Sequence, residues 1–384
     1  MQDILIKKTI RPLIKWTGGK YEEFPKFAVH IPPFEQYFEP FFGGGGVFFA
    51  LQPAGQSFVN DRSSDLITFY RSLTDPAFRQ EMYSLVEAWE GLRVLYEDFA
   101  AFIRSDFTHF LSDALTQDTL YHQIDQYFES PTCHAILQDL RVFKTIEFAE
   151  ILGFLQHSTK DKFRRIKRIT DREQRVFGGN ELDEHIETAL RSGFYLYIRR
   201  LMNDSKARSL APATQTAVWY FVREFCYASM FRFNAKGEFN IPYGGIAYNR
   251  KNLRTKVDAL FVPELQELFT NCKLHNLDFE VFLEQNRPQK NDFIFLDPPY
   301  DSEFSEYDQN SFTQADQLRL RDCLAQQEAS WMMVIKETPF IRRIYEEIDA
   351  YFIDFDKTYL YNVRGRNNRE TKHLIITNYN ATDR

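Results

Sequence analysis

Cysteine is scarce in this sequence, and long apolar runs are missing from it. The 384 residues contain four cysteines, at Cys133, Cys226, Cys272 and Cys323, with no CxxC pair and no histidine at metal-ligand spacing. This pattern predicts the reduced thiols of a cytosolic protein and excludes a disulfide framework or a cysteine-based metal site. No apolar run reaches membrane-spanning length, and the charged start MQDILIKKTIRPLIKW does not resemble a signal peptide. We therefore expect a cytoplasmic protein with no membrane partner and no metal.

Positive net charge is lacking too, since the formal net charge is −7 at pH 7. This balance argues against wholesale wrapping of nucleic acid, although a local basic face on an acidic body is compatible with it. One basic stretch, KDKFRRIKRITDREQR (residues 160–175), carries eight Lys or Arg against three Asp or Glu. A solvated helix face would have the same composition, so the stretch by itself leaves both interpretations open.

Aromatic residues are the abundant class, with 38 Phe and 20 Tyr. Hydrophobic content of 44% and charged content of 26% are ordinary for a globular protein, and the length allows a large core and two domains. Many of these rings belong to the core, but aromatic faces also stack on nucleobases.

Short apolar runs alternate with helical text at both ends of the chain. The strand-like runs are QYFEP, QSFVND, NDFIFLD, SWMMVIKE and KHLIITNY. The helix-like text is VFFAL, DLITFYRSL and TQADQLRLRDCLAQQ. Such alternation predicts an α/β fold with a twisted, mostly parallel sheet covered on both faces.

The middle of the chain differs from the ends because it is amphipathic and helix-like, with almost no strand-like alternation. We interpret it as a helical domain inserted between two halves of one sheet. The predicted boundaries are residues 1–70 for the first half, 71–190 for the insertion and 191–384 for the second half.

Four consecutive glycines, Gly43 to Gly46, follow a predicted strand in FEPFFGGGGVFFA. Glycines allow positive φ and close backbone approach to a ligand, and the next helix presents free N–H groups. The GK[ST] ending of a P-loop is absent. Asp61 ends the next strand, where a carboxylate accepts hydrogen bonds from ribose hydroxyls. Together these features predict an adenosine-containing cofactor; the alternative is a flexible turn followed by a helix-capping aspartate.

The stretch NDFIFLDPPYD places Asp297 at the carboxyl end of a buried strand, where open α/β sheets bind ligands. Pro298 and Pro299 lack N–H donors and make the turn rigid. The amino group of an aromatic base is a poor nucleophile, because its lone pair is delocalised into the ring. The Asp297 carboxylate and the Pro298 carbonyl are two acceptors that would favour a tetrahedral amino nitrogen and stabilise its growing positive charge. Tyr300 supplies a face for stacking.

A resemblance to a known family emerges from KWTGGK, FEPFFGGGG, VNDRSSDLI and FIFLDPPY taken together. The sequence resembles the Dam-type DNA adenine-N6 methyltransferases, which share its order of parts: cofactor motifs first, target recognition in the middle and DPPY late. The segment FCYASMFRFNAKGEFNIPYGG (residues 225–245) is similar to a further motif of that family. The resemblance covers about the first 70 residues and those after about 190.

The resemblance implies a Rossmann-like α/β methyltransferase domain with a mixed, mostly parallel sheet of the seven-stranded type, interrupted by a helical target-recognition domain. The reaction it implies is site-specific transfer of a methyl group from S-adenosylmethionine to the exocyclic amine of a flipped adenine in double-stranded DNA. It further suggests a restriction–modification, phage-defence or phage setting, with a cognate restriction endonuclease or defence-system proteins as additional partners.

The resemblance also implies site residues. Those expected to bind S-adenosylmethionine are Lys15, Trp16, Gly18, Lys20, Glu39, Pro40, Phe41, Gly43, Gly44, Gly45, Asp61, Asp278 and Phe279. Those expected to hold the flipped adenine are Asp297, Pro298, Pro299 and Tyr300. Those expected on the DNA side are Arg232, Asn234 and Lys236 in the turn within residues 229–250, then Arg164, Arg165, Lys167 and Arg168, and finally Arg364 and Arg366. For the last pair, a solvated hairpin is an equal alternative.

Two alternative functions stay open at this point. One is methylation of cytosine at its exocyclic amine or of adenine in RNA, although cytosine-directed relatives more often carry Ser in place of Asp297. The other is a DNA-binding subunit that keeps the fold without catalysis, although every motif position is intact. A phosphate-binding nucleotidase is excluded, because the sequence has no Walker lysine and no metal-ligand cluster.

Overall fold

A computed structural model describes residues 10–16, 18–139, 148–299, 306–307, 310–358 and 370–381. The chain divides into two compact units. The first, which we call the sheet unit, joins Met1–Arg71 to Val262–Arg384, and the second, the helical unit, is Ser72–Phe261. No helix within the described ranges is both long and apolar enough to cross a membrane.

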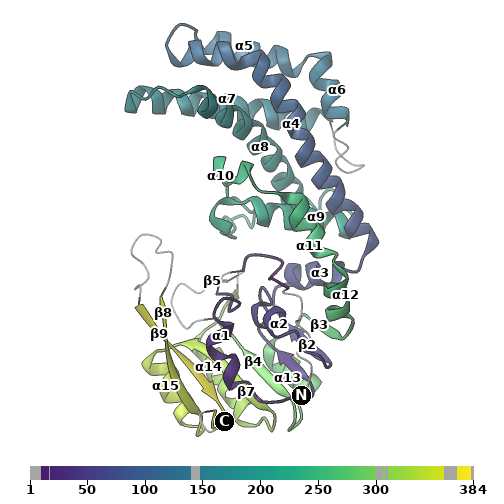
Figure 1. Cartoon of the computed structure of the whole chain (residues 1–384), viewed down its shortest axis with the longest axis vertical. Coiled ribbons are helices and arrows are strands. Elements are labelled where there is room, and N and C mark those ends of the chain that lie inside the picture. The colour runs from purple at the N-terminus through teal and green to yellow at the C-terminus, as the bar shows by residue number, and fades with distance from the viewer. Residues whose placement is uncertain are drawn as a thin grey trace, which may run out of the picture. The chain divides into compact units, whose positions relative to one another are not determined.

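The sheet unit is built on seven strands in the order β3-β2-β1-β4-β7-β9-β8 (Figure 1). Neighbours from β3 to β7 pair in parallel, and β9 runs antiparallel between β7 and β8. The strands are β1 Tyr37–Glu39, β2 Ser57–Asn60, β3 Cys272–His275, β4 Phe293–Leu296, β7 Ser330–Lys336, β8 Tyr351–Thr358 and β9 Glu370–Thr377. A separate antiparallel pair joins β5 Glu306–Tyr307 to β6 Asn310–Ser311.

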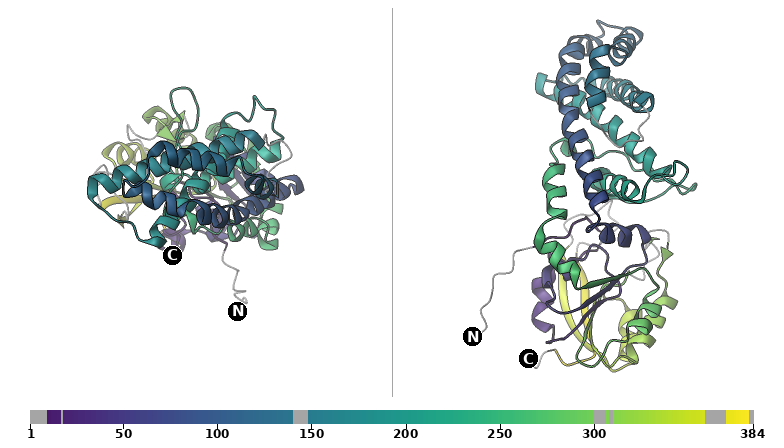
Figure 2. Two further views of the ribbon diagram at one scale, coloured as in Figure 1. Left: turned by 90° about the horizontal axis from the view of Figure 1, so that it is seen from above. Right: turned by 90° about the vertical axis from the view of Figure 1, so that its right-hand side faces the viewer.

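Helices cover both faces of this sheet, as the right-hand view of Figure 2 shows with the yellow strands between helices on either side. Strand β4 illustrates why: its alternate side chains point to opposite faces. Ile294 and Leu296 belong to a core cluster that includes residues of α13, α14 and α15. On the other face, Phe293 stacks on Phe34 and Phe295 on Phe27. The helices are α1 Phe24–Phe27, η1 Ala28–His30, α2 Gly46–Leu51, α3 Ser64–Ser72, α12 Pro263–Thr270, α13 Phe279–Asn286, α14 Gln314–Ala325 and α15 Pro339–Glu346.

The predicted α/β fold class with a mostly parallel, seven-stranded sheet is confirmed. Two strands of this sheet were not identified by the sequence analysis: β8, and β3, whose four residues are only partly buried and show no apolar run. A strand is held in a sheet by pairing with its neighbour as well as by burial of its own side chains. An edge strand with few buried side chains therefore leaves little apolar pattern in the sequence.

The helical unit contains long helices, and the sequence SLTDP (residues 72–76) leads into the longest of them, α4. Asp75 caps this helix by accepting a hydrogen bond from the Ala77 amide at 2.8 Å, and Pro76 occupies its first position. The helices are α4 Pro76–Leu111, α5 Gln117–Phe128, α6 Pro131–Asp139, α7 Phe148–Glu173, α8 Gly179–Asn203, α9 Pro212–Phe225, η2 Tyr227–Ser229, α10 Ile246–Asn249 and α11 Leu253–Leu260.

Two close contacts fix the packing of α7 in this unit. Phe163 of α7 stacks on Phe107 of α4 with ring centroids 3.8 Å apart. At Gly193 of α8, an added Cβ would lie 2.8 Å from the Leu155 Cα, so only glycine allows the two helices to approach this closely. The insertion is therefore a packed helical body with its own core.

The helical unit extends beyond the predicted end at residue 190, as far as Phe261. The turn that follows α9 is tied to α8: the Asn203 side chain exchanges hydrogen bonds with the backbone of Phe239, and the Tyr195 hydroxyl donates to the Ile241 carbonyl. Residues 191–261 therefore pack with the helical unit, whereas the sequence analysis assigned them to the second half of the sheet domain.

Candidate cofactor and amino-group site

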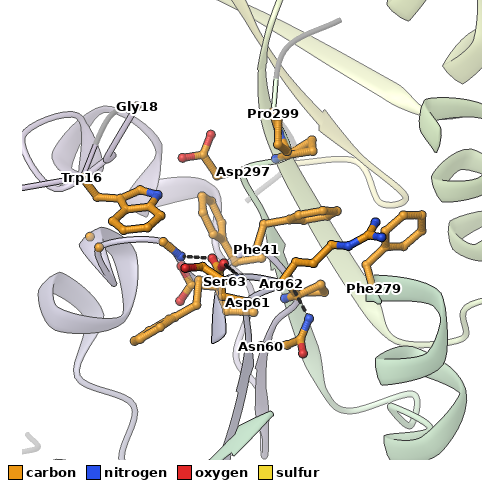
Figure 3. Close-up of a pocket in the computed structure, with 18 of the residues that line it drawn as sticks. Trp16, Gly18, Phe41, Asn60, Asp61, Arg62, Ser63, Phe279, Asp297 and Pro299 are labelled. Carbon is orange, nitrogen blue, oxygen red and sulfur yellow. Dashed lines mark hydrogen bonds between the residues drawn. The ribbon is translucent and has the colours of Figure 1, made fainter. Parts of the chain in front are cut away.

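A pocket with about 1150 Å³ of empty space, part of it open to solvent, lies in the sheet unit at the carboxyl ends of β1, β2 and β4 (Figure 3). Its lining comes from segments far apart in the sequence: Trp16, Gly18–Lys20, Glu39–Gly44, Gly46–Val47, Asn60–Ser63, Leu277–Phe279, Phe295, Asp297–Pro299, Phe312 and Asp316.

The glycine loop after β1 packs closely against Trp16. Gly43 has φ +51°, and a Cβ there would lie 2.9 Å from Cδ1 of the Trp16 indole. Gly45 has φ +67°, and a Cβ there would lie 2.7 Å from the Phe49 ring. Both positions therefore need glycine for conformation and for space. Glycine is therefore needed at position 43 to leave room for the Trp16 indole, whether or not a ligand also approaches the loop backbone.

Asp61, at the end of β2, organises the floor of the pocket (Figure 3). Its carboxylate accepts from the Gly43 amide through Oδ2 and from the Ser63 amide through Oδ1, each at 2.8 Å. The preceding residue, Asn60, is buried and joins two loops by donating to the carbonyls of Pro40 and Leu277. These bonds bring the ends of β1, β2 and β3 into one rigid edge.

Three aromatic rings line the opposite end of the pocket. Phe41, Phe279 and Phe312 contact one another with centroid distances of 5.5, 5.6 and 5.9 Å. Asp278 caps α13 by accepting from the Glu280 amide at 3.1 Å, so its carboxylate is held at the same end. Flat apolar rings beside a fixed acceptor suit a purine with an exocyclic amine.

Asp297 at the tip of β4 forms an ion pair with Lys20, 277 positions earlier in the chain. The Lys20 Nζ lies 2.6 Å from Asp297 Oδ1 and 3.0 Å from the Gly18 carbonyl oxygen. The Lys20 side chain is 1% exposed and that of Asp297 is 20% exposed. After Asp297, the Pro299 carbonyl accepts from the buried Gln317 side chain at 3.2 Å, which anchors the proline turn to α14.

Glu39, the last residue of β1, is buried beside this pair. Its Oε2 accepts from the Tyr37 hydroxyl at 2.8 Å. Burial raises the pKa of the Glu39 carboxyl well above its usual range; the Tyr37 hydrogen bond acts in the opposite direction, and the nearby Asp297 and Asp61 carboxylates raise the pKa further. The raised pKa favours the neutral, protonated form of the Glu39 carboxyl.

The lining of the pocket carries more acids than bases. Five carboxylates line it, against one ammonium and one guanidinium. A ligand with positive charge is favoured in such a site, and one with several phosphates is disfavoured. In the described part of the chain, no group of three or more His, Cys, Asp or Glu side chains could hold a metal ion.

The structure brings together most of the residues predicted to bind a cofactor and an amino group. Lys15 is exposed, and neither it nor Gly45 is among the residues that line the pocket. Tyr300 lies outside the described residues. Several lining residues were not assigned to the site by the sequence analysis, among them Asn60, Arg62, Phe312 and Asp316. For Asn60, the signal was its place at the end of an apolar strand beside Asp61. Phe312 and Asp316 lie in YDQNSFTQADQLRL (residues 307–320), a segment similar to the closing portion of the Dam-type family, but the similarity assigned neither residue a role.

The residues predicted on the DNA side lie in the helical unit, except Arg364 and Arg366, which fall outside the described residues. Arg232 and Lys236 are exposed. The Asn234 side chain serves the turn itself, because its Oδ1 accepts from the amides of Lys236 and Glu238 at 2.9 and 3.0 Å.

The predicted DNA-contacting residues of α7 fall into two groups. Arg164 pairs with Asp161, and Lys167 lies 2.6 Å from Asp171 and 2.8 Å from Asp113. Arg165 and Arg168 are exposed, and within the described ranges no carboxylate pairs with either.

A mostly parallel sheet with a glycine loop after β1, an acid after β2 and an acceptor pair after β4 fits a Rossmann-like methyltransferase acting on an amino group. Comparison with known proteins gives the family. Residues 16–176 and 160–360 match the model of the D12 class N6 adenine-specific DNA methyltransferases. The chain belongs to this family, and the resemblance to Dam-type enzymes is confirmed. It is an adenine-specific DNA methyltransferase, and DNA is its substrate.

Individual relatives agree with this assignment. The chain is 23% identical over 384 residues to the type II methyltransferase M1.LlaDCHI of Lactococcus lactis subsp. cremoris, covering 97% of both chains. It is 31% identical over 196 residues to the type II methyltransferase M.CviBI of Paramecium bursaria Chlorella virus NC1A, covering 48% of this chain and 72% of the relative. It is 28% identical over 200 residues to a DNA adenine methylase of Vibrio cholerae, covering 49% of this chain and 66% of the relative.

Proposed function

We propose that the pocket of the sheet unit binds S-adenosylmethionine and that Asp297 receives the N6 amino group of an adenine turned out of double-stranded DNA. The observation that carries this proposal is the shared pocket: Asp297 and the Trp16–glycine loop line the same space. A methyl donor held by the loop would therefore meet an amino group held by the tip of β4.

The residues present fit S-adenosylmethionine. Its ammonium and sulfonium groups are cationic, which suits a lining with an excess of carboxylates. We assign the ribose hydroxyls to Asp61 and the adenine to Asp278, Phe41 and Phe279. Glu39, whose pKa is raised by burial, would lose its proton beside the cationic end of the ligand.

The chain's own residues would prepare the amino group for attack. Lys20 fixes Asp297 through Oδ1, and we assign Oδ2 and the Pro298 carbonyl as acceptors for the two amino hydrogens. These acceptors would stabilise the positive charge that develops on the nitrogen during methyl transfer, and the proton that the nitrogen then releases would pass to solvent beside the partly exposed Asp297. S-adenosylmethionine supplies the electrophilic methyl group. Turning the base out of the duplex costs a few kcal/mol, which DNA contacts must offset.

We propose that Arg165 and Arg168 contact DNA phosphates, together with Arg232 and Lys236. Arg164 and Lys167 are already paired with carboxylates of this unit, so they have less positive charge to offer a phosphate. A charge-removing variant of Arg165 and Arg168 should lower the slope of log affinity against log salt by about two, at roughly 0.9 per phosphate. The matched control, Arg164→Gln with Lys167→Gln, should change that slope by less than one.

The helical unit is the candidate for sequence recognition, through base contacts in the major groove. Exchange of residues 72–261 with those of another family member should transfer the sequence preference, and an unchanged preference would remove this assignment. Since several relatives are named type II or modification methylases, we also propose a restriction–modification setting with a cognate endonuclease as partner.

Methylation of unmodified DNA by the purified protein tests the central proposal. With S-adenosylmethionine present, nucleoside mass analysis should detect N6-methyladenine. The Asp297→Ala variant should keep cofactor affinity within about threefold while losing transfer by about 10²-fold or more. Appearance of N4-methylcytosine, methylation of RNA alone, or full activity of Asp297→Ala would contradict the assignment.

A further inference from the structure

Arg319, on α14, is absent from the pocket lining but touches the residues at its aromatic end. Its guanidinium carbon lies 4.9 Å from the centre of the Phe279 ring. We propose that Arg319 is a positioning residue that holds Asp278 and Phe279 in the arrangement that selects a 6-aminopurine. This inference rests on the proposed binding of an adenosine cofactor at that end.

The guanidinium bridges three carboxylates. Its Nη2 donates to Asp278 Oδ1 at 2.7 Å and to Glu280 Oε2 at 2.6 Å, its Nε donates to the same Glu280 oxygen at 2.9 Å, and its Nη1 donates to Asp316 Oδ1 at 3.0 Å. The planar fork of arginine fixes the relative positions of its partners, which a lysine ammonium cannot do. Because the Arg319 side chain is 40% exposed, these pairs add little to stability, and their main effect is geometric.

The two oxygens of the Asp278 carboxylate have different surroundings. Oδ1 accepts from Arg319 and from the Glu280 amide. Oδ2 lies 3.7 Å from Arg62 Nη1, which is longer than a hydrogen bond, and the Arg62 side chain is 62% exposed. With Oδ1 engaged in this way, the carboxylate cannot rotate freely, and Oδ2 is the oxygen available to accept from a ligand amino group.

The Phe279 ring is held by its neighbours in a similar way. Arg319 covers it from α14, while Phe41 and Phe312 meet it at 5.5 and 5.9 Å. Asp316, a partner of Arg319, also forms a capping box with Thr313, directly after Phe312. One guanidinium therefore links the N-termini of α13 and α14, which carry two of the three rings.

A fixed acceptor discriminates between adenine and hypoxanthine. The amino group of adenine donates a hydrogen bond to a carboxylate. The carbonyl oxygen of hypoxanthine at the same position repels the carboxylate and leaves that carboxylate without a donor. A site built around one such hydrogen bond rejects the wrong partner only when the acceptor cannot move away. Loss of Arg319 should release Asp278 and so reduce this discrimination.

Titration calorimetry with S-adenosylhomocysteine and S-inosylhomocysteine tests the inference. The unmodified protein should prefer the adenosyl compound by about 30-fold or more. Arg319→Met should lower affinity for the adenosyl compound by about tenfold and reduce the preference to about threefold, with Arg319→Lys between the two. The control is Arg321→Met on the same helix, which removes ion pairs to Asp322 and Glu347 and should leave both affinities unchanged.

Each outcome is decisive. Equal losses for both compounds in Arg319→Met would mean that the residue only supports the fold, and unchanged affinities would mean that it does nothing here; either overturns the inference. If Arg319→Met does not fold, Arg319→Lys carries the test, because a preserved preference with a displaced ammonium would overturn the inference equally. If the unmodified protein binds neither compound, the proposed cofactor itself is wrong.

In methyl transfer, Arg319→Met should raise the KM for S-adenosylmethionine about tenfold and change kcat by less than about twofold.

Discussion

Removal of Asp297 should cost stability as well as catalysis, because its partner Lys20 is buried. At the observed 2.6 Å, two unit charges attract by about 6 kcal/mol with an effective dielectric constant of 20. Most of that attraction compensates for desolvation, but breaking one side of a buried pair typically costs about 3–5 kcal/mol. Since the Asp297 side chain is 20% exposed, we expect the lower end, about 3 kcal/mol, for Asp297→Ala.

The reverse change should be milder. Lys20→Met leaves the carboxylate of Asp297, which reaches water, and fills the buried space with an apolar chain, so we expect a loss of about 1 kcal/mol. Combining both changes should restore about 1–2 kcal/mol relative to the sum of the single losses, because the double variant leaves no buried charge. Methyl transfer should be lost with Asp297→Ala and with the double variant.

Amide hydrogen exchange in increasing urea, read from peptides that cover β4 and β7, reports opening of the sheet unit. Peptides of α4 and α8 in the same samples are the control, and their exchange should not change. A stability loss below about 0.5 kcal/mol for Asp297→Ala, or strictly additive losses in the double variant, would refute the reasoning about the pair.

Three further predictions concern the glycine loop and its carboxylates. Gly45→Ala should lower the free energy of unfolding in urea by about 2–3 kcal/mol, since the added methyl group meets both a positive φ and a clash with Phe49. The control is Gly237→Ala, where φ is positive but the space is open, and it should lower the unfolding free energy by about 1 kcal/mol. Equal losses of unfolding free energy in the two variants would contradict the clash. Burial raises the pKa of Glu39 well above 4.5, so its protonated form stabilises the fold at low pH, and this stabilisation declines as the pH rises above about 4.5. The unfolding free energy of Glu39→Gln minus that of the unmodified protein should therefore increase with pH, by up to about 1.4 kcal/mol per pH unit. A difference that does not change with pH would contradict this reasoning. Asp61→Ala should raise the Kd for S-adenosylmethionine by more than about tenfold in calorimetry, since the carboxylate anchors the glycine loop and is the group proposed to bind the ribose hydroxyls; an unchanged Kd would remove that role.

Much of the sheet unit could be predicted from the sequence, because most of its strands are buried and therefore consist of consecutive apolar residues. QSFVND, NDFIFLD and SWMMVIKE correspond to β2, β4 and β7, and TQADQLRLRDCLAQQ to α14. Strand β3 escaped prediction because it is short and half-exposed, and its pairing with β2 depends on the fold. The extent of the helical unit was underestimated, because side chains of α8 hold the turn at residues 226–243 through contacts that no local pattern encodes.

The site was predictable where a motif carries its own geometry. The glycine loop and the tip of β4 could be placed at one sheet edge by topology alone. The Lys20–Asp297 pair could not, since it joins positions 277 apart. Phe312 and Arg319 also lie far in sequence from Phe279, which both contact, and the family-like segment that contains them assigned neither residue a role. The roles of the predicted residues in binding and catalysis stay predictions until the experiments above are made.

The pairing of β2 with β3 has a consequence for synthesis on the ribosome. Ser57 lies opposite Cys272, yet about 190 residues of the helical unit are made between these strands. At roughly 5–20 residues per second, β2 waits for about 10–40 s with an open edge before its neighbour emerges. Closing a flexible chain of that length would cost about 3 kcal/mol more entropy than closing a loop of ten residues. A nascent helical body that has already condensed removes most of this penalty, so we expect the half-made sheet to be the stage at which a chaperone is needed.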